Sequence, residues 1–154
     1  VLSSNVESLD LNMAQYCIIP TENGSAVDDA YLYRFEEDRY LLVVNAANTD
    51  KDLAHLNEQI KAYDAKMTVI TGDYAAIAVQ GPKAKELLQT LSGGEAVTEP
   101  VKNALNTLKF EGRTVRVAKT GYTGEPIGYE VYIESAEAAW LWNRLIELGA
   151  KPAG

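Results

Sequence analysis

Cysteine and histidine are nearly absent from this sequence. Its 154 residues include one cysteine, Cys17, and one histidine, His55. A lone cysteine cannot form an internal disulfide, and a lone histidine leaves little material for a zinc site or a Ser-His-Asp triad. We therefore expect no bound metal and a reducing compartment, the cytoplasm, for a bacterial-type soluble protein. Cys17 lies in an apolar run, which is typical of a small buried hydrophobe.

Clustered basic residues and long apolar runs are also missing. The 14 Lys and Arg residues are scattered and are outnumbered by 22 Asp and Glu residues, which gives a net charge of −8. Binding to a phosphate backbone needs clustered positive charge, so we expect no nucleic-acid partner. No run approaches the roughly 18 apolar residues of a membrane span, and no signal segment opens the chain, so we expect no membrane partner. The first residue, Val1, is not methionine, which predicts that the sequence is trimmed from a longer one.

Apolar residues, by contrast, are plentiful and fall in short periodic runs. They make up 47% of the chain, enough for a sizeable core in one globular domain or one and a half small ones. Apolar runs bounded by turn residues predict strands over residues 14–19, 27–35, 40–45, 67–71, 74–80, 106–110, 114–119 and 129–133. Helical spacing predicts three helices, after residues 48, 81 and 134. Hairpin-length links indicate an α+β fold of mainly antiparallel sheets with flanking helices, and no Gly-x-Gly-x-x-Gly supports a Rossmann fold.

The predicted helix ends carry recognisable cap residues. Thr49 with Asp52 three residues later has the pattern of a capping box, and Pro82 suits the first position of a helix. Ser135 is expected to cap the last helix and Gly149 to end it. His55 lies off the apolar stripe of its helix, so we expect it to be exposed.

The stretch Thr120-Gly-Tyr-Thr-Gly-Glu-Pro-Ile-Gly-Tyr-Glu130 is rich in glycine, tyrosine and glutamate. It is not a phosphate loop, because it lacks the Lys-Ser/Thr of such loops and leads into a strand. Its glycines permit the close approach of a flat ligand, to which Tyr122 can offer a ring face. Glu130 can accept two parallel hydrogen bonds from an amidine-like edge, such as that of a pterin or guanine. The alternative, which the chemistry alone favours, is an ordinary hairpin loop with packed tyrosines and solvated glutamates.

Two adjacent aspartates, Asp28 and Asp29, open a predicted strand. Alternation sends their side chains to opposite faces and puts Asp29 on the face of three aromatic residues, Tyr31, Tyr33 and Phe35. A carboxylate among aromatic rings is costly unless it is paired or used, which singles out Asp29. Pattern alone nevertheless favours two solvated acids in a turn.

Three further polar residues lie beside buried runs. Asn45 and Asn48 follow a continuous apolar strand, where they fit helix capping, the favoured interpretation, or hydrogen bonds to a ligand. Tyr16 lies inside an apolar run and is expected in the core, with one partner for its hydroxyl.

Taken in order along the chain, the motifs match those of a known family. They are Leu2-Ser-Ser-Asn5, Ala14-Gln-Tyr-Cys17, Val27-Asp-Asp29, Leu42-Val-Val-Asn-Ala-Ala-Asn48, Lys51-Asp-Leu53, Ala78-Val-Gln-Gly-Pro-Lys-Ala84, Thr120-Gly-Tyr-Thr-Gly-Glu125, Gly128-Tyr-Glu130 and Gly149-Ala-Lys-Pro-Ala-Gly154. The chain strongly resembles the aminomethyltransferases, the T proteins of the glycine cleavage system. The resemblance covers essentially the whole chain.

The resemblance implies transfer of a one-carbon unit to tetrahydrofolate from an aminomethyl group on the lipoyl arm of H protein, with release of ammonia. By motif position, Asp29 resembles the catalytic acid beside the reactive folate amines. We expect it to orient the amine and favour the positive charge of an iminium-like transition state, more than to abstract a proton. Glu130 resembles the acceptor of the pterin edge, with Tyr122 and Asn45 as further pterin contacts and Tyr16 lining the pocket.

The chain departs from the family in two ways. Pro126-Ile127 supplies two loop residues where the commonest family form has one, which affects the placement of Glu125 more than that of Glu130. A T protein also begins earlier and continues into an arginine-bearing stretch and a C-terminal barrel. We therefore expect residues 1–50 to be part of a first folate-binding subdomain truncated at its N-terminus, residues 51–154 to be a second α+β subdomain, and the barrel to be absent.

Two alternatives to the full enzyme remain open on the sequence. One is a non-catalytic folate-binding relative that assists iron–sulfur cluster assembly; such relatives usually lack the paired aspartates and the intact Tyr-Thr-Gly-Glu loop, and both are present here. The other is an interaction module without a small ligand. In the leading interpretation, a folate-binding fragment of the enzyme, the 154-residue chain alone is expected to turn over poorly or not at all.

Overall fold

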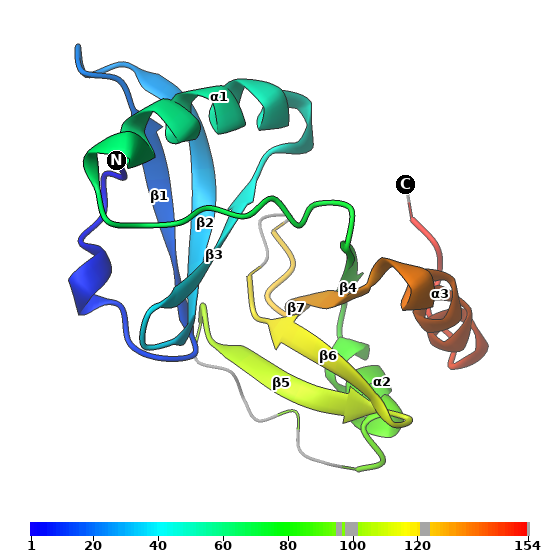
Figure 1. Ribbon diagram of the computed structural model, residues 1–154. Helices are drawn as coiled ribbons and strands as arrows, with labels where there is room; N and C mark the ends of the chain where they lie inside the picture. The colour runs from blue at the N-terminus through cyan, green and yellow to red at the C-terminus, as the bar shows by residue number, and fades with distance from the viewer. Residues whose placement is uncertain (95–96, 98–101, 121–123, 154) are drawn as a thin grey trace. The chain divides into compact units, whose positions relative to one another are not determined.

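Two antiparallel sheets and three α-helices make up the fold in the computed structural model, which describes residues 1–94, 97, 102–120 and 124–153. The strands are β1 (Met13–Pro20), β2 (Ala26–Glu36), β3 (Arg39–Val44), β4 (Tyr74–Gln80), β5 (Leu105–Phe110), β6 (Arg113–Ala118) and β7 (Gly128–Glu134). The helices are α1 (Thr49–Gln59), α2 (Ala84–Leu91) and α3 (Ala138–Glu147). The predicted α+β class with antiparallel sheets and flanking helices is confirmed (Figure 1). In the described part of the chain, no helix has the length and apolar character needed to cross a membrane.

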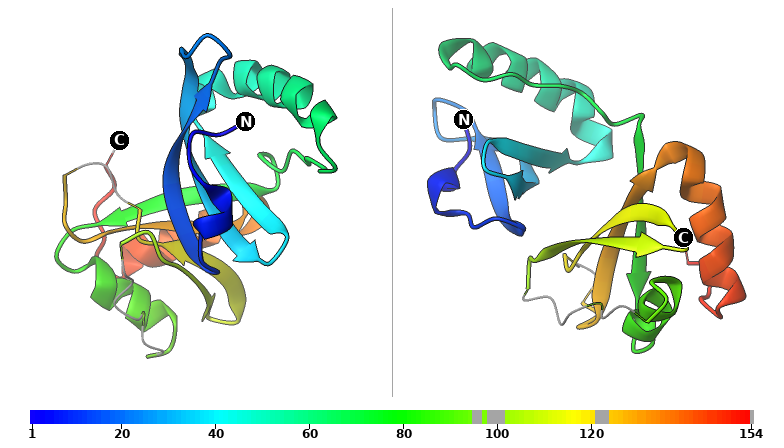
Figure 2. Two further views of the ribbon diagram at one scale, coloured as in Figure 1. Left: turned by 90° about the vertical axis from the view of Figure 1, so that its left-hand side faces the viewer. Right: turned by 60° about the horizontal axis from the view of Figure 1, so that its bottom comes forward.

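The chain forms two compact units, Val1–Val69 and Ile70–Gly154. In the first unit, β1, β2 and β3 form a meander in that order, and α1 lies across one face of it (Figures 1 and 2). Leu56 of α1 packs there on alternate sheet residues, among them Ile19 and Leu32. The apolar alternation read from the sequence therefore defines the buried face.

The division between the units falls later than the sequence suggests. A division after residue 50 would separate α1 from the sheet that it covers, whereas the contacts place it in the first unit and divide the chain after Val69. The physical reason is the burial of Leu56, which is 7% exposed, against the first sheet. The assignment of the two parts to folate-binding subdomains stays a prediction.

The second unit holds a four-stranded sheet in the order β4-β7-β6-β5. Helices α2 and α3 both pack into one apolar cluster with Tyr129, Val131 and Ile133, the alternate residues of β7 (Figure 2). Because β7 alternates, Glu130 and Tyr132 project from the face of the sheet opposite the two helices.

Turn chemistry explains why β5 and β6 pair as predicted. Glu111 and Gly112 both have positive φ, 47° and 88°. Two such residues form the turn whose twist matches that of a two-residue hairpin. The register that follows pairs Phe110 with Arg113.

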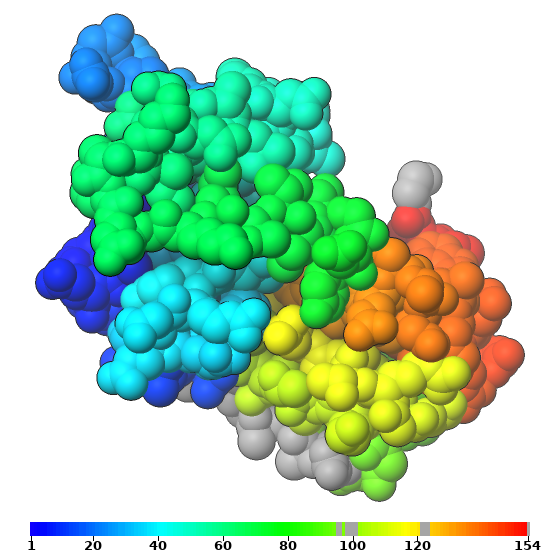
Figure 3. Space-filling view, viewed as in Figure 1, coloured from blue at the N-terminus to red at the C-terminus, as the bar shows by residue number. Residues whose placement is uncertain are grey.

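One predicted strand does not form. Residues 67–70 belong to no helix or strand, and the Asp73 N–H closes a turn on the Ile70 carbonyl at 2.9 Å. Most of the segment 61–70 is exposed, and it continues over the surface after α1 (green in Figure 3). Apolar residues predicted a strand there, but a strand also needs a neighbouring edge.

Two predicted helix starts are displaced. Pro82 lies in a turn, and α2 begins two residues later at Ala84, whose N–H donates to the Gly81 carbonyl. The Ser135 hydroxyl donates to the Gly72 carbonyl at 2.8 Å and makes no cap hydrogen bond; a 3-10 turn, Ser135–Glu137, precedes α3. Gly149, with φ 98°, ends α3 as predicted.

Candidate functional site

Asp29 and Tyr16 meet on one face of the first sheet. Alternation along β2 puts Asp28 on the face of Ala30 and Leu32, which α1 covers, and Asp29 on the opposite face. The Tyr16 hydroxyl donates to Asp29 Oδ2 at 2.9 Å. The predicted separation of the two carboxylates is confirmed.

Tyr16 is not a core residue, so that expectation is wrong. Its side chain is 47% exposed, and its ring contacts the ring of Tyr31, its register partner, edge to face at 5.9 Å between centroids. It lies on the sheet face opposite α1, because alternation gives that helix Cys17 instead. The hydrogen bond to Asp29, followed by desolvation, raises the pKa of Tyr16, so the phenol stays a donor at neutral pH.

Asn45 joins the two aspartates. It directly follows β3, whose last residue Val44 pairs with Ala30 of β2. Its Nδ2 lies 2.8 Å from Asp29 Oδ1 and 3.1 and 3.2 Å from the two carboxylate oxygens of Asp28. The amide nitrogen of Asn45, at the end of β3, therefore faces the carboxylates of both aspartates of β2.

The asparagines do not cap with their side chains, contrary to the favoured expectation. Asn45 and Asn48 occupy cap positions of the turn and of α1, but neither side chain makes a cap hydrogen bond. Asn48 has φ −110° and ψ 0°, away from the extended geometry that aims a cap oxygen at the helix. Both side chains bond Asp28 instead. Hydrogen bonds to a charged acceptor are stronger than neutral ones, which explains the preference.

Asp28 also faces an acid on α1, Asp52. Burial acts to raise the pKa of Asp28, but hydrogen bonds from Asn48, Asn45 and the Asp29 backbone hold that pKa below its ordinary value. Burial, and then the neighbouring Asp28 carboxylate, raise the pKa of Asp52. The two carboxyl groups thus differ in the ease with which they ionise.

Asp52 does not act in the predicted capping box. Thr49 is the first residue of α1, and its hydroxyl donates to the carbonyls of Asn45 and Ala46. Asp52 is completely buried. The sequence held a signal for this, because Asp52 precedes the buried Leu56 by four residues and so shares its helix face.

Glu130 lies in the second unit, held by two hydroxyl groups. Thr120, which is 2% exposed, donates from Oγ1 to Glu130 Oε2, and the Tyr132 hydroxyl donates to the same oxygen at 3.3 Å. The solvated glutamate of the ordinary-loop interpretation is therefore wrong for Glu130. Tyr132 was missed in the sequence although it lies two residues after Glu130 on a strand, and so on the same face.

The loop before β7 is partly described. Tyr122 lies outside the described residues, so its predicted contact stays a prediction. The Ile127 N–H donates to the Glu125 carboxylate at 3.2 Å, and the Ile127 carbonyl accepts from the Gly81 N–H at 2.9 Å. The Ile127 side chain packs on the core of the second unit. The two-residue tip thus ties the loop to the turn before α2.

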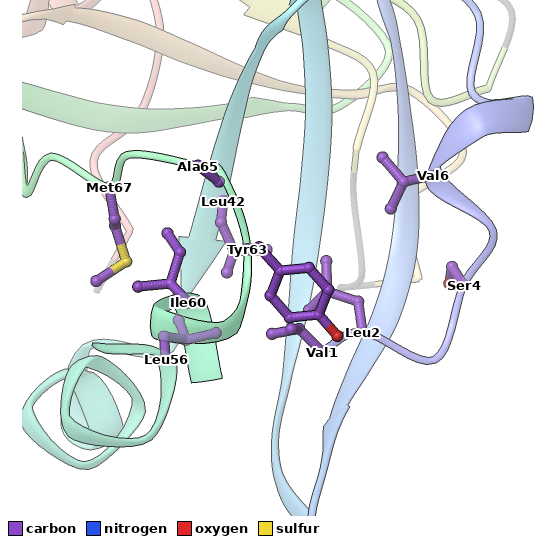
Figure 4. A pocket seen from close by; sticks show the side chains of 10 residues that line it. All are labelled: Val1, Leu2, Ser4, Val6, Leu42, Leu56, Ile60, Tyr63, Ala65 and Met67. Carbon is purple, nitrogen blue, oxygen red and sulfur yellow. The ribbon is translucent and has the colours of Figure 1, made fainter. Parts of the chain in front are cut away.

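The structure brings together three of the five predicted site residues: Asp29, Tyr16 and Asn45. Glu130 belongs to the other unit. A separate cavity of about 410 Å³ in the first unit is lined almost entirely by apolar side chains, among them Leu42, Leu56 and Met67 (Figure 4). None of the five predicted residues lines it, so it carries no part of the candidate chemistry.

The described acidic residues do not gather into a metal site. Within the described ranges, no three His, Cys, Asp or Glu side chains are grouped to hold a metal ion. His55 is half-buried, not exposed as expected, and its buried Nε2 has no hydrogen-bond partner among the described residues. His55 follows the completely buried Asp52 by three residues and so shares that side of α1, which explains the burial.

Comparisons with known proteins agree with the motifs. The family model described as the GCVT N-terminal domain matches residues 1–154. An aminomethyltransferase of Thermus thermophilus is 42% identical over 152 residues, which are 99% of this chain and 43% of the relative. An aminomethyltransferase of Deinococcus deserti is 41% identical over 154 residues, which are 100% of this chain and 43% of the relative.

A solved structure has the same fold. The crystal structure of glycine cleavage system aminomethyltransferase T from Bartonella henselae superimposes with a TM-score of 0.80 and 25% sequence identity, over 94% of this chain and 38% of that one. The chain thus spans less than half the length of these relatives. By its sequence over all 154 residues and by its fold, the chain belongs to the GCVT N-terminal domain family of the aminomethyltransferases.

Proposed function

We propose that the full-length protein carrying this domain transfers a one-carbon unit to tetrahydrofolate from an aminomethyl group on the lipoyl arm of H protein. Ammonia and methylenetetrahydrofolate are released, and the arm is left as dihydrolipoyl. The named activity of the relatives supports the reaction class. The observation that carries the proposal is the Asp29 carboxylate, oriented by one donor on each oxygen.

Asp29 has the geometry of a preorganised negative charge. Tyr16 donates to Oδ2 at 2.9 Å and Asn45 to Oδ1 at 2.8 Å, so the plane of the carboxylate is set before a ligand arrives. A fixed carboxylate stabilises positive charge that develops on an amine beside it, without reorganisation during the reaction. We therefore assign Asp29 the catalytic role, with Tyr16 and Asn45 orienting it.

The fit of a folate rests on exposed ring surface and oriented acceptors. The half-exposed ring of Tyr16 offers a flat apolar face next to the Asp29 carboxylate. Glu130 is a carboxylate oriented by Thr120 and Tyr132, which suits the planar edge of a pterin. Asn45 and Tyr122 are proposed as further pterin contacts by motif position. We propose lipoylated H protein as the partner that delivers the aminomethyl group.

The decisive experiment is Asp29→Asn in the full-length protein, assayed with tetrahydrofolate and aminomethyl-lipoyl H protein. The substitution keeps the shape but removes the charge, so we expect kcat to fall about 100-fold or more, with a much smaller change in folate affinity. Asp38→Asn, an exposed aspartate in the turn between β2 and β3, is the matched control and should leave kcat unchanged.

Three outcomes would contradict parts of the proposal. Unchanged turnover in Asp29→Asn would remove that residue from the active site. Folate binding without aminomethyl transfer by the unsubstituted protein would place it with the non-catalytic folate-binding relatives. Calorimetry showing no binding of tetrahydrofolate to the full-length protein would favour the remaining alternative, an interaction module without a small ligand.

A further inference from the structure

Asp52 is the one acid of the first unit that is completely buried and has no role in the proposed reaction. It lies in the first part of α1 with 0% exposure. Neither of its carboxylate oxygens accepts a hydrogen bond from any described residue. An ionised carboxylate in that position would be costly, because burial removes its hydration and no donor replaces it.

The titratable groups around Asp52 do not supply a bonded cation. Lys51, its neighbour on α1, directs its ammonium to the Val27 carbonyl at 2.6 Å. His55, one turn along the helix, leaves Nε2 without a partner among the described residues. On the turn after α1, Lys61 pairs with Glu58.

The remaining charged neighbour is Asp28. It lies on the face of β2 that α1 covers, and Asp52 lies with Leu56 on the buried side of that helix. The Asp28 carboxylate accepts from Asn45, whose Nδ2 lies 3.1 and 3.2 Å from its two oxygens. The same Asn45 nitrogen holds Asp29 at 2.8 Å. A contact that fixes Asp28 therefore acts on Asp29 through one amide group.

We propose that Asp52 is a protonated carboxylic acid that donates a hydrogen bond to the Asp28 carboxylate, and that it thereby positions Asp29 through Asn45. The protonated form resolves the burial of Asp52, because it needs a single acceptor and Asp28 provides it. The opposite directions of the two pKa shifts, raised for Asp52 and lowered for Asp28, agree with a donor facing an ionised acceptor. The role of Asp29 in this chain of contacts rests on the proposed function, whereas the protonation of Asp52 does not.

The first test follows the carboxyl carbons of Asp28, Asp29 and Asp52 by NMR as pH is raised, with each resonance assigned from an Asp→Asn variant. We expect Asp52 to keep its proton at a pH where Asp28 is already ionised. Because the two groups are coupled, the pair should titrate in two steps, with the later step at Asp52. Assignment of the later step to Asp28, or ionisation of Asp52 in the range of an exposed aspartate, would overturn the proposal.

The second test compares stability against pH in the wild type and in Asp52→Asn, which keeps a neutral donor of similar shape. In the unfolded chain Asp52 ionises at about pH 4. Its raised pKa in the folded state means that the native protein binds more protons above that pH, so the stability from Asp52 is lost as pH rises. We expect the urea midpoint of the wild type to fall relative to that of Asp52→Asn as pH rises from about 4 towards the raised pKa. A constant difference would contradict the inference.

The third test is activity of the full-length protein, with Asp52→Leu as the variant that removes the donor but keeps the bulk. We expect Asp52→Leu to lower kcat by up to about 100-fold, with a smaller change in KM. Asp52→Asn should retain wild-type kcat at neutral pH and hold it to higher pH than the wild type. Equal kcat and the same pH profile in Asp52→Asn, Asp52→Leu and the wild type would overturn the positioning role.

The tests separate this inference from the proposed function. The carboxyl titration and the urea midpoints involve neither folate nor H protein. A protonated Asp52 in a protein without transfer activity would leave the inference on Asp52 standing and reject the reaction. An ionised Asp52 in an active protein would reject only the inference.

Discussion

Asn45 is the side chain on which the arrangement of both aspartates depends. Its Nδ2 is within hydrogen-bond distance of both Asp28 oxygens and of Asp29 Oδ1. The hydrogen bond from Asn45 helps to hold the pKa of Asp28 below its ordinary value. We therefore expect Asn45→Ala to raise the pKa of Asp28, measured from its carboxyl carbon by NMR. Asn57→Ala, an exposed asparagine on α1, is the control and should leave that pKa unchanged; equal pKa values in both variants would exclude Asn45 as the bridge.

At the same scale, the sequence predicted some roles and missed others for physical reasons. Alternation alone separates Asp28 from Asp29, because a strand allows two side-chain directions only. The spacing of Asp52 and Leu56 is a signal for the burial of Asp52, but an acid near the start of a helix is also what the helix dipole favours at the surface, so the sequence alone does not decide between the two. Tyr16 was misplaced because an apolar run does not tell which of the two sheet faces is covered. Only the packing of α1 decides that.

At the scale of elements, the hairpin between β5 and β6 depends on two residues with positive φ. Gly112 has φ 88°, a conformation that costs a residue with a side chain about 1–2 kcal/mol. We expect Gly112→Ala to lower the free energy of urea unfolding by about that amount. Gly72→Ala is the matched control, because Gly72 is free of positive φ and an added Cβ meets no atom within 4 Å. An equal loss in both variants would show that the turn conformation is not the cause.

The hairpin also shows which elements a single sequence specifies. Glu111-Gly112 encodes the turn locally, so the two strands of the hairpin were predicted correctly. The side chain of Glu111 also pairs with Arg144 of α3 at 2.5 Å. The run Met67 to Thr71 was predicted as a strand from composition alone. Its failure has a non-local cause, the lack of a neighbouring strand edge, which no local pattern contains.

At the scale of the whole molecule, two separate apolar clusters, one in each unit, indicate two bodies joined by an exposed segment. Lys66 lies in that segment, whereas Lys51 lies inside α1 and is tied to the Val27 carbonyl. Proteases cut exposed backbone far faster than helical backbone, because cleavage requires local unfolding. We therefore expect limited trypsin digestion to cut first after Lys66, which mass spectrometry of the fragments will show.

Lys66→Gln provides the control for this digestion, since it removes the cleavage site without changing the segment's exposure. In that variant the first cut should be slower, and both units should persist longer as one chain. The boundary after residue 50 and the boundary after Val69 lead us to expect different first cuts. A first cut after Lys51 would mean that α1 opens before the segment that follows it, in favour of the boundary after residue 50. A first cut after Lys66 would support the boundary after Val69, because α1 would then be retained with the sheet that Leu56 covers.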